Sequence, residues 1–509
     1  MAVSVLFLKP EDYLDEASLS EPAFFIDLNF NQIVESATKE TEEYNLTPFY
    51  YMPLHSPDAI NYRHEVFEDI GSEKVLKVIK AFSDDMHEVR AYLEMTKKDY
   101  YEHQNERLFL DAASIYIKAV QQLAKGLKKQ NIYSRGLTSF MKYLDKYLAS
   151  KRFLTLAEQT KELEEELASI RYEILIDGAK VEIKHYKNEP NYSTAVQDSF
   201  KRFAQEEESY YHYNFRDHTS MDQVEGRILD LLAHLYSDTF TKLTTYCTEH
   251  KHFMNDDIVR FDREVHFYIA YLTYISHLDS KKLSFCYPEV DTSKAVSVKN
   301  GFDLALASKL ADDSKVPVTN DFYLKGSERI IIVSGPNQGG KTTFARMFGQ
   351  LHYLASLGLL TPGSEAHLYL PGGIYTHFEK EEQAADLRGK LEDDLVRAHE
   401  ILKVATPTSI ILINEIFTST TLQDAILLSK RIGNSISKLD ALTVWITFID
   451  ELTTLSNKTI SMVSIVEDNK TATRTFKIVR KPADGLAYAL SIAEKYRLSS
   501  SQIVKRIKT

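Results

Sequence analysis

An apolar segment that runs into a glycine-rich loop constrains this chain more than any other feature. Residues 328–334 are β-rich and apolar, and they are followed by Gly335-Pro336-Asn337-Gln338-Gly339-Gly340-Lys341-Thr342. The loop fits the pattern G-x-x-x-x-G-K-[ST], and a helical pattern begins at Thr343. Glycines in such a loop let backbone N–H groups turn inward around phosphate, and the helix N-terminus adds favourable dipole charge. The segment predicts a nucleotide-phosphate site, with a structural glycine turn as the alternative.

Two side chains of the loop have the chemistry that ATP binding requires. Lys341 can reach the β- and γ-phosphates, and the Thr342 hydroxyl can bind Mg²⁺. The backbone from Gly335 to Gly340, together with Thr343, completes the expected cofactor site. We therefore expect ATP and Mg²⁺ as cofactors, with Lys341 acting in both binding and catalysis.

A second motif follows the apolar run Ile410–Ile413. An acidic pair at such a strand end usually serves nucleotide hydrolysis, because the first acid holds Mg²⁺ and the second orients or deprotonates the attacking water. Here the first position is Asn414, which keeps an oxygen ligand without the charge. The second is Glu415, which we expect to be catalytic. An ordinary strand end is the alternative.

The chain divides into three parts by its patterning. Residues 1–60 mix short apolar stretches with Pro, Asn and acidic residues, which predicts a connecting region. Residues 61–284 repeat apolar positions three or four apart and predict a long-helix core or lever domain, with an extended helix pair at 221–277. Within it, Asp177-Gly178 predicts a hairpin turn between two short strands, so we place a small insertion at about 172–220.

Residues 285–509 alternate β-rich runs with helical patterns, which is typical of an α/β domain. The expected strands are 328–334, 408–414, 441–448 and 473–479, read as buried strands of a largely parallel sheet. The predicted fold class is therefore multidomain, α plus α/β, with the nucleotide site in the C-terminal domain.

Composition limits the protein's environment and partners. No apolar run approaches the roughly 20 residues that cross a bilayer. The first residues lack the basic region of a signal peptide, and the only cysteines are Cys247 and Cys286. These features predict a reducing, cytoplasmic location without a membrane. The net charge of -12 argues against a surface that attracts nucleic acid everywhere.

Two local patches remain open to interpretation. Residues 125–152 carry many basic residues against the single acid Asp145, and either a solvated helical face or a phosphate-contacting surface would explain them. The aromatic and histidine residues at 210–218 are either a packed loop or a base-stacking surface. The histidines at 352, 367, 377 and 399 are not spaced as a metal cluster.

Several of these segments resemble the MutS family of DNA mismatch-repair ATPases. GPNQGGKTT at 335–343 is similar to the family's GPN-x-GGKST, and PLHSPDAINYRHEVFEDI at 53–70 resembles the start of its core domain. VPVTNDFYL at 316–324 is similar to the family's V-P-N-D segment beside the nucleotide base, which implies a binding role for Asn320 and Asp321. The closing residues from Gly485 resemble the family's C-terminal helices. The resemblance covers about residues 50–509.

The resemblance implies an ABC-type ATPase head, long lever helices and a clamp-like insertion. It also implies a homodimer or heterodimer formed through the heads, with DNA engaged at the helical end. No mismatch-recognition domain is evident in the first 50 residues, so a direct role in reading mismatches is not expected.

Two departures from the family concern turnover. The family's D-E-I-G-R-G-T-S-T-x-D-G appears here as residues 414–425, in which Asn414 and Phe417 replace an acid and a glycine. The family's T-H-Y-x-E-L becomes residues 447–452, and Phe448 cannot donate a hydrogen bond to the γ-phosphate as histidine would.

These features lead to three hypotheses about function. The first is a MutS-like, slow ATPase that dimerises and engages DNA without reading mismatches. The second is a nucleotide-gated scaffold or heterodimer subunit with little or no hydrolysis. The third, a nucleotide-binding subunit of a membrane transporter, is disfavoured by the helical N-terminal half and by the lack of an LSGGQ-like signature.

Overall fold

The computed structural model describes residues 3–9, 13, 15–98, 101–178, 180–187, 221, 223–279, 283–379, 389–466 and 474–483. The chain forms two compact units. The first, called here the sheet unit, comprises Met1–Gly71, Tyr133–Leu137 and Arg263–Thr509, and the second, the helical unit, comprises Ser72–Ile132 and Thr138–Asp262. The mixture of helices and sheet agrees with the predicted fold class. None of the helices described is both long and apolar enough to cross a membrane.

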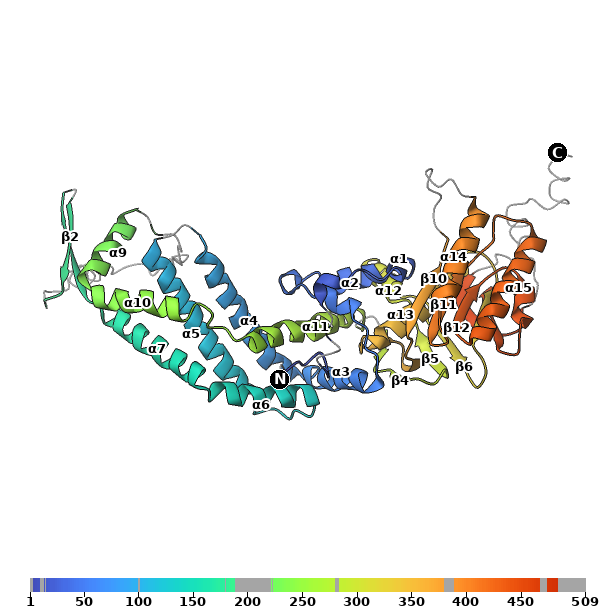
Figure 1. Cartoon of the computed structure of the whole chain (residues 1–509), viewed down its shortest axis with the longest axis horizontal. Helices are drawn as coiled ribbons and strands as arrows, with labels where there is room; N and C mark the ends of the chain where they lie inside the picture. The colour runs from blue at the N-terminus through green and yellow to red at the C-terminus, as the bar shows by residue number, and fades with distance from the viewer. Residues whose placement is uncertain are drawn as a thin grey trace, which may run out of the picture. The chain divides into compact units, whose positions relative to one another are not determined.

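The helical unit is built on amphipathic helices that pack by their apolar faces. Those wholly within it are α4 (Glu73–Met95), α5 (Glu102–Leu127), α7 (Lys151–Ser169), α9 (Gln223–Leu235) and α10 (Ser237–Glu249). Helices α6 (Arg135–Leu148) and α11 (Asp256–Asp279) have residues in both units. Helices α4 and α5 lie side by side (Figure 1) because each buries apolar residues three or four apart. On α6, Phe140 stacks on Phe261 with ring centroids 3.6 Å apart.

The predicted hairpin is present. Strands β1 (Tyr172–Asp177) and β2 (Lys180–His185) pair antiparallel, and Gly178 turns between them with a φ of 57°. A positive φ at a tight hairpin turn favours glycine, as the sequence indicated. The predicted insertion beyond Lys187, including the aromatic patch at 210–218, lies outside the described residues.

The helix pair predicted at 221–277 is wrong in detail. The structure has α9, α10 and α11 there, with breaks at Tyr236 and after Glu249. Tyr236 adopts φ -118° and ψ 44°, which are not helical values, so the helix is interrupted at this residue. The apolar periodicity of the sequence continues through the interruption and therefore does not predict it.

The sheet unit contains a six-stranded sheet in the order β10-β11-β12-β7-β13-β14. Strands β10 (Gly373–His377), β11 (Ser409–Asn414), β12 (Leu442–Ile446), β7 (Ile330–Ser334) and β13 (Thr459–Val466) pair in parallel. The predictions at 328–334, 408–414 and 441–448 are confirmed by β7, β11 and β12. The segment 473–479 is instead the antiparallel edge strand β14 (Arg474–Arg480), and its Phe476 and Val479 are exposed.

Helices cover both faces of this sheet. Alternate strand residues such as Ile332, Ile413 and Trp445 share a core with α14 (Lys390–Val404) and α15 (Leu422–Leu439). Strand residues of the opposite parity face α13 (Lys341–Ser356), where Gly349 lies so close to Leu412 that a side chain would not fit. The parallel strands are therefore buried on both sides, as their continuous apolar character indicated.

Smaller elements surround this layer. Strands β4 (Glu289–Asp291), β9 (Glu365–Tyr369), β5 (Val296–Gly301) and β6 (Asn320–Leu324) form a second sheet, and β3 (Phe285–Cys286) pairs with β8 (Thr361–Pro362). Among the described residues of the unit, the remaining helices are α1 (Phe24–Asp27), α2 (Phe30–Thr38), α3 (Pro57–Ile70) and α12 (Leu304–Asp312). Short 3-10 turns occur at Glu16–Ser18, Glu42–Tyr44, Thr47–Tyr51 and Asp450–Thr454.

The N-terminal segment packs against α13. The Gln350 side chain donates to the Leu28 carbonyl at 2.8 Å, and Arg346 donates to the Asp27 carbonyl at 2.9 Å. Tyr353 lies within an aromatic group that includes Phe25. Residues far apart in sequence therefore stabilise the helix that begins at the glycine-rich loop.

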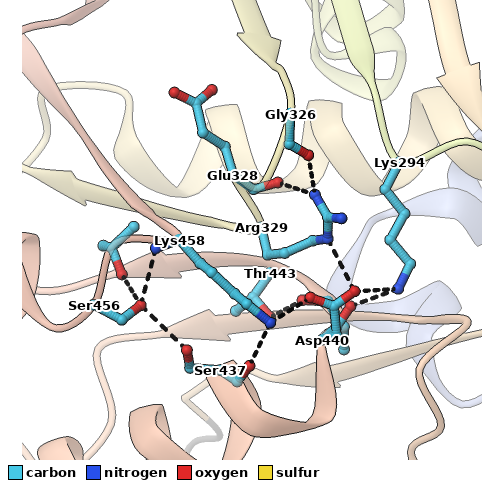
Figure 2. Close-up of polar contacts among 11 residues, drawn as sticks. Lys294, Gly326, Glu328, Arg329, Ser437, Asp440, Thr443, Ser456 and Lys458 are labelled. Carbon is cyan, nitrogen blue, oxygen red and sulfur yellow. Dashed lines mark hydrogen bonds and ion pairs between the residues drawn. The ribbon is translucent and has the colours of Figure 1, made fainter.

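A charged cluster fixes the amino ends of the central strands (Figure 2). Asp440, just before β12, accepts hydrogen bonds from Arg329 before β7 at 3.1 Å and from Lys458 before β13 at 2.5 Å. Lys294 lies 3.0 Å from the same carboxylate. These cations hold the pKa of Asp440 well below its usual range, although partial burial opposes them. The carboxylate thus joins neighbouring strands at the edge opposite the glycine-rich loop.

Candidate nucleotide-binding site

The glycine-rich loop connects β7 to α13 at the carboxyl edge of the parallel sheet. Gly335 has a φ of 122° and Gly340 a φ of 90°, values that side chains strongly disfavour. A Cβ on Gly339 would lie 2.4 Å from the Ser464 hydroxyl, which donates a hydrogen bond to the Gly339 carbonyl at 2.7 Å. The loop therefore needs its glycines both for backbone shape and for its packing against β13.

Lys341 is held inside the loop that it follows. Its Nζ donates to the carbonyls of Gly335 at 3.0 Å and Pro336 at 3.2 Å, and to the Asn337 side chain at 3.3 Å. The same Nζ lies 3.5 Å from Oε1 of Glu415. Burial lowers the pKa of Lys341, and Glu415 opposes that effect. A lysine placed in this way can exchange carbonyl partners for phosphate oxygens with little movement of its stem.

Thr342 and Asn414 meet where Mg²⁺ was expected. The Thr342 hydroxyl donates to Oδ1 of Asn414 at 3.2 Å, so the start of α13 faces the end of β11. Mg²⁺ accepts neutral oxygen ligands and usually keeps several waters beside nucleotide phosphates. The two side chains fit such an ion as a partial ligand set that lacks a direct carboxylate.

Glu415 follows directly in a left-handed conformation, with a φ of 53°. Its backbone N–H donates to the Ile446 carbonyl at 3.0 Å, which anchors the residue beyond the paired part of β11. Its side chain is 27% exposed and lines the same cavity as Lys341. A carboxylate in this place can accept a hydrogen bond from a water molecule that approaches the nucleotide.

A cavity of about 960 Å³ extends from the loop, and its size suits a nucleotide. Its polar side includes Lys341, Thr342 and Glu415. The residues that line it are Leu306, Leu310, Lys315, Val316, Pro317, Val318, Asn320, Asn337, Gln338, Gly340, Lys341, Thr342, Thr343, Glu415 and Phe476.

Asn320 and Asp321 were expected beside the nucleotide base, and only Asn320 lines the cavity. Asn320 lines the cavity, but its amide group accepts from the Ile478 N–H at 2.7 Å and donates to the Phe476 carbonyl at 3.3 Å. Asp321 is exposed, does not line the cavity, and accepts from the Asn300 N–H at 2.6 Å. In this arrangement Asn320 joins β6 to β14, and Asp321 stabilises the irregular pairing of β5 with β6 at Asn300.

The apolar wall of the cavity was not predicted. It includes Leu306 and Leu310 of α12 and Phe476 of β14. Phe476 has a φ of 57° and lies where the pairing of β13 with β14 shifts register. Such β-bulges re-aim side chains, and here the bulge brings Phe476 to 3.6 Å from the position that a Cβ on Gly340 would take. No local sequence signal marks this bulge.

Phe448, which follows β12, is 50% exposed and does not line the cavity. Its neighbour Thr447 is buried and donates its backbone N–H to Val333 at 3.1 Å. The backbone of this motif is therefore fixed beside β7, while the aromatic side chain faces outward.

Comparisons with known proteins agree with this geometry. Residues 331–509 match MutS domain V. A DNA mismatch repair protein MutS from Shouchella clausii is 29% identical over 212 residues, which are 41% of this chain and 24% of that protein. A MutS from a Thermotoga species is 30% identical over 187 residues, covering 35% and 23%.

The similarity also reaches a eukaryotic protein. The DNA mismatch repair protein Msh3 of Mus musculus is 27% identical over 147 residues, covering 29% of this chain and 13% of that protein. The chain thus spans about a quarter or less of these relatives. The matched region contains the phosphate loop, Asn414 and Glu415, so this C-terminal part of the chain is similar to MutS domain V, the ATPase domain of these proteins.

Proposed function

We propose that this chain binds ATP with Mg²⁺ and hydrolyses it slowly, dimerises through its ATPase domain, and engages DNA in a repair- or recombination-related role without reading mismatches. The ATP site belongs to the predicted domain 285–509, which we take to be an ABC-type head. DNA contact is assigned to the predicted domain 61–284, with its clamp-like insertion at about 172–220. Residues 1–60 are the predicted connecting region.

The observation that carries the ATP proposal is the convergence of Lys341, Thr342 and Glu415 on one cavity beside the glycine-rich loop. Backbone N–H groups of the loop and the start of α13 would bind the phosphates. Lys341 would then neutralise the charge on the β- and γ-phosphates. The apolar wall that includes Leu310 and Phe476 offers a surface for the base.

The chain's own residues have separate tasks in hydrolysis. Glu415 orients the attacking water and accepts its proton at a carboxylate oxygen. Lys341 stabilises the negative charge on the transferred phosphoryl group and the leaving group. Mg²⁺, when bound, would be held by Thr342 and Asn414 and would supply further positive charge at the phosphates.

The proposals of a dimer and of DNA binding rest on the relatives. Proteins named DNA mismatch repair protein MutS or Msh3 share the ATPase domain with this chain. Site residues in the family pattern that contact the partner's nucleotide are altered here at Phe417 and its neighbours. A homodimer and a heterodimer with a better-equipped partner are both consistent with that change.

A nucleotide-gated scaffold is the second candidate, and two observations favour it. Asn414 provides a neutral ligand where an acid would bind Mg²⁺ more strongly. Phe448 is half exposed and has no donor for a γ-phosphate. Both changes weaken transition-state stabilisation more than they weaken ground-state binding of ATP.

Steady-state ATP hydrolysis and equilibrium binding of a fluorescent ATP analogue test the proposal, with the wild type measured beside two variants. Lys341→Ala should lose binding and turnover together, because it removes the phosphate-binding cation. Glu415→Gln should keep binding within a few-fold and lose most turnover, because the amide cannot accept the water's proton. Lys430→Ala, at an exposed lysine of α15, is the control for loss of one positive charge.

The outcomes separate the two candidates. Turnover that is lost in both site variants supports an ATPase. Tight binding that depends on Lys341, with no turnover above the level of Glu415→Gln, supports the scaffold. If the wild type fails to bind the analogue in the presence of Mg²⁺, both candidates are wrong.

A further inference from the structure

Acidic residues are almost absent from one part of the helical unit. Residues 112–157 contain Asp145 as their single acid, although the whole chain has 73 acidic and 61 basic residues. The basic residues of this stretch that belong to the helical unit are Lys118, Lys125, Lys128, Lys129, Lys142, Lys146, Lys151 and Arg152. All of them are exposed.

Helical spacing gathers these residues on outward faces. Lys118 and Lys125 are seven positions apart and share one face of α5, and Lys128 and Lys129 follow directly after its last residue, Leu127. On α6, Lys142 and Lys146 are one turn apart on the side opposite the buried Phe140 and Leu144. Lys151 and Arg152 open α7 directly after α6.

Contacts between the helices join these faces into one surface. Lys128 Nζ lies 2.6 Å from Oδ1 of Asp145, which brings the end of α5 beside α6 and neutralises the stretch's single acid. A groove of about 380 Å³ between α4 and α5 continues the surface, because Lys74 and Lys77 line it opposite Gln122 and Gln130. Asp85 lies at the same groove and is its acidic member.

The surface retains charge repulsion that a merely solvated helix face would avoid. Lys142 and Lys146 are a like-charge pair four residues apart on α6, an arrangement that destabilises helices. Lys125 and Lys129 gather further positive charge at the end of α5. These four lysines form no ion pair with any described residue. Exposed helices that serve only for solubility usually mix charges of both signs. The retained repulsion indicates a partner of opposite charge.

The chemistry of the surface identifies the kind of polyanion. Lysine ammonium groups act as point charges toward phosphate, and phosphate contacts carry no sequence information. Single-strand binders add exposed aromatic side chains for base stacking. Of the aromatic residues at 125–153, Phe140, Tyr147 and Phe153 are buried, Tyr143 is half-buried and Tyr133 is exposed, so the stretch offers one exposed ring and not a row of them. Regularly spaced phosphates of a double helix therefore fit this surface better than unstacked bases do.

We propose that the surface defined by Lys118, Lys125, Lys128, Lys129, Lys142, Lys146, Lys151 and Arg152, named here the basic surface, binds the backbone of double-stranded DNA without base specificity. The inference rests on the DNA-binding part of the proposed function and is independent of the nucleotide site. Binding through the basic surface should be strongly salt-dependent, because each phosphate that a lysine neutralises releases condensed counterions.

Fluorescence anisotropy of a labelled 30-base-pair duplex with the full chain tests this inference at several salt concentrations. The test variants are Lys125→Glu with Lys129→Glu, and Lys142→Glu with Lys146→Glu. Each pair should weaken binding at least about tenfold at 0.1 M salt and reduce the slope of log K against log salt by about 2. The control, Lys403→Glu with Lys430→Glu on exposed positions of α14 and α15, changes the net charge equally and should alter binding less than about twofold.

The assay distinguishes failure of this inference from failure of the proposed function. If the wild type binds the duplex and the test variants bind equally well, the basic surface is not the site, although DNA binding stands. If the control weakens binding as much as the test variants, net charge alone explains it and the inference is wrong. If the wild type binds no duplex with or without ATP, the DNA part of the proposed function fails as well.

Folding and ligand class are checked in parallel. Circular dichroism and binding of the ATP analogue should be unchanged in the test variants, because the mutated side chains are exposed and lie in the other unit from the ATP site. Preferential binding of a single-stranded oligonucleotide or of anionic phospholipid vesicles, lost in the same variants, would overturn the assignment to duplex DNA.

Discussion

The carboxylate of Asp394 accepts a hydrogen bond from the backbone N–H of Phe417 at 3.1 Å. Phe417 follows the catalytic candidate Glu415 by two residues and has a φ of 64°, in the left-handed region. Its side chain is fully buried in the core shared by the sheet, α14 and α15. The family pattern has a glycine at this position, and the observed φ gives the physical reason. This chain instead combines an unfavourable backbone conformation with a buried aromatic ring.

Substituting Phe417 separates these two effects. Loss of the buried ring should destabilise Phe417→Ala by roughly 3–5 kcal/mol. Phe417→Gly loses the same ring but relieves a left-handed conformation that costs an L-residue roughly 1–2 kcal/mol. We expect the glycine variant to be about 1 kcal/mol more stable than the alanine variant in denaturant unfolding. Elsewhere glycine is usually the less stable of the two, because it loses more backbone entropy on folding. An alanine variant as stable as the glycine variant would contradict the left-handed assignment.

Asn414→Asp tests whether the neutral ligand limits Mg²⁺ use. A carboxylate beside the Thr342 hydroxyl should bind Mg²⁺ more strongly than an amide oxygen does. We expect the Mg²⁺ concentration for half-maximal ATP-analogue binding to fall by about tenfold, with faster turnover. A Mg²⁺ titration of both proteins measures the change, and Asn414→Ala should shift it in the opposite direction. Equal Mg²⁺ dependence in all three proteins would exclude Asn414 as a ligand.

Local signals made part of the structure predictable. β7, the glycine-rich loop and α13 follow one another in sequence, so their order, burial and backbone requirements could all be read together. The same holds for the hairpin at Gly178, where two residues determine the turn. Strand β10 was missed because its Tyr375, Thr376 and His377 give no apolar run, and its extended conformation is stabilised by pairing with β11. Domain boundaries placed from patterning stay predictions.

Features that arise from distant pairing could not be predicted in this way. Phe476 reaches the cavity only because the pairing of β14 with β13 shifts register there. The contact of Asn320 with β14 likewise depends on residues more than 150 positions later. Asp394 lies on α14, and nothing near it in sequence indicates that it holds the loop after Glu415. Such relationships follow from sheet order, which a single sequence does not encode locally.

Asp440→Asn tests the charged cluster at the amino ends of the strands. Asn tolerates the φ of 63° at this position, so the variant removes charge without adding backbone strain. It leaves Lys294, Arg329 and Lys458 close together without their shared carboxylate. We expect a loss of about 1–3 kcal/mol in the free energy of unfolding at pH 7. Because the folded pKa is depressed, the difference should be fully present above the unfolded pKa of about 4 and should decline as pH falls from there toward the folded pKa. A difference that does not decrease at all between pH 7 and pH 2 would show that charge is not its cause.

His352 provides the last prediction, which concerns acid stability. The ring is fully buried on α13, its Nδ1 lies 2.8 Å from the Phe348 carbonyl, and burial lowers its pKa to about 4. In the unfolded chain the pKa of histidine is about 6.5, so between these values the unfolded state binds more protons and stability rises with pH. Lowering the pH from 7.5 to 5 should therefore cost about 2 kcal/mol through this residue alone.

His352→Leu should lose about that much less stability over the same interval, whatever its packing cost, because that cost is present at both pH values. His64 and His377, whose pKa values burial also lowers to about 4, should keep a residual pH dependence in the variant. Denaturant unfolding of both proteins at pH 7.5 and 5 measures the difference, and equal losses would mean that His352 is not titrated by unfolding.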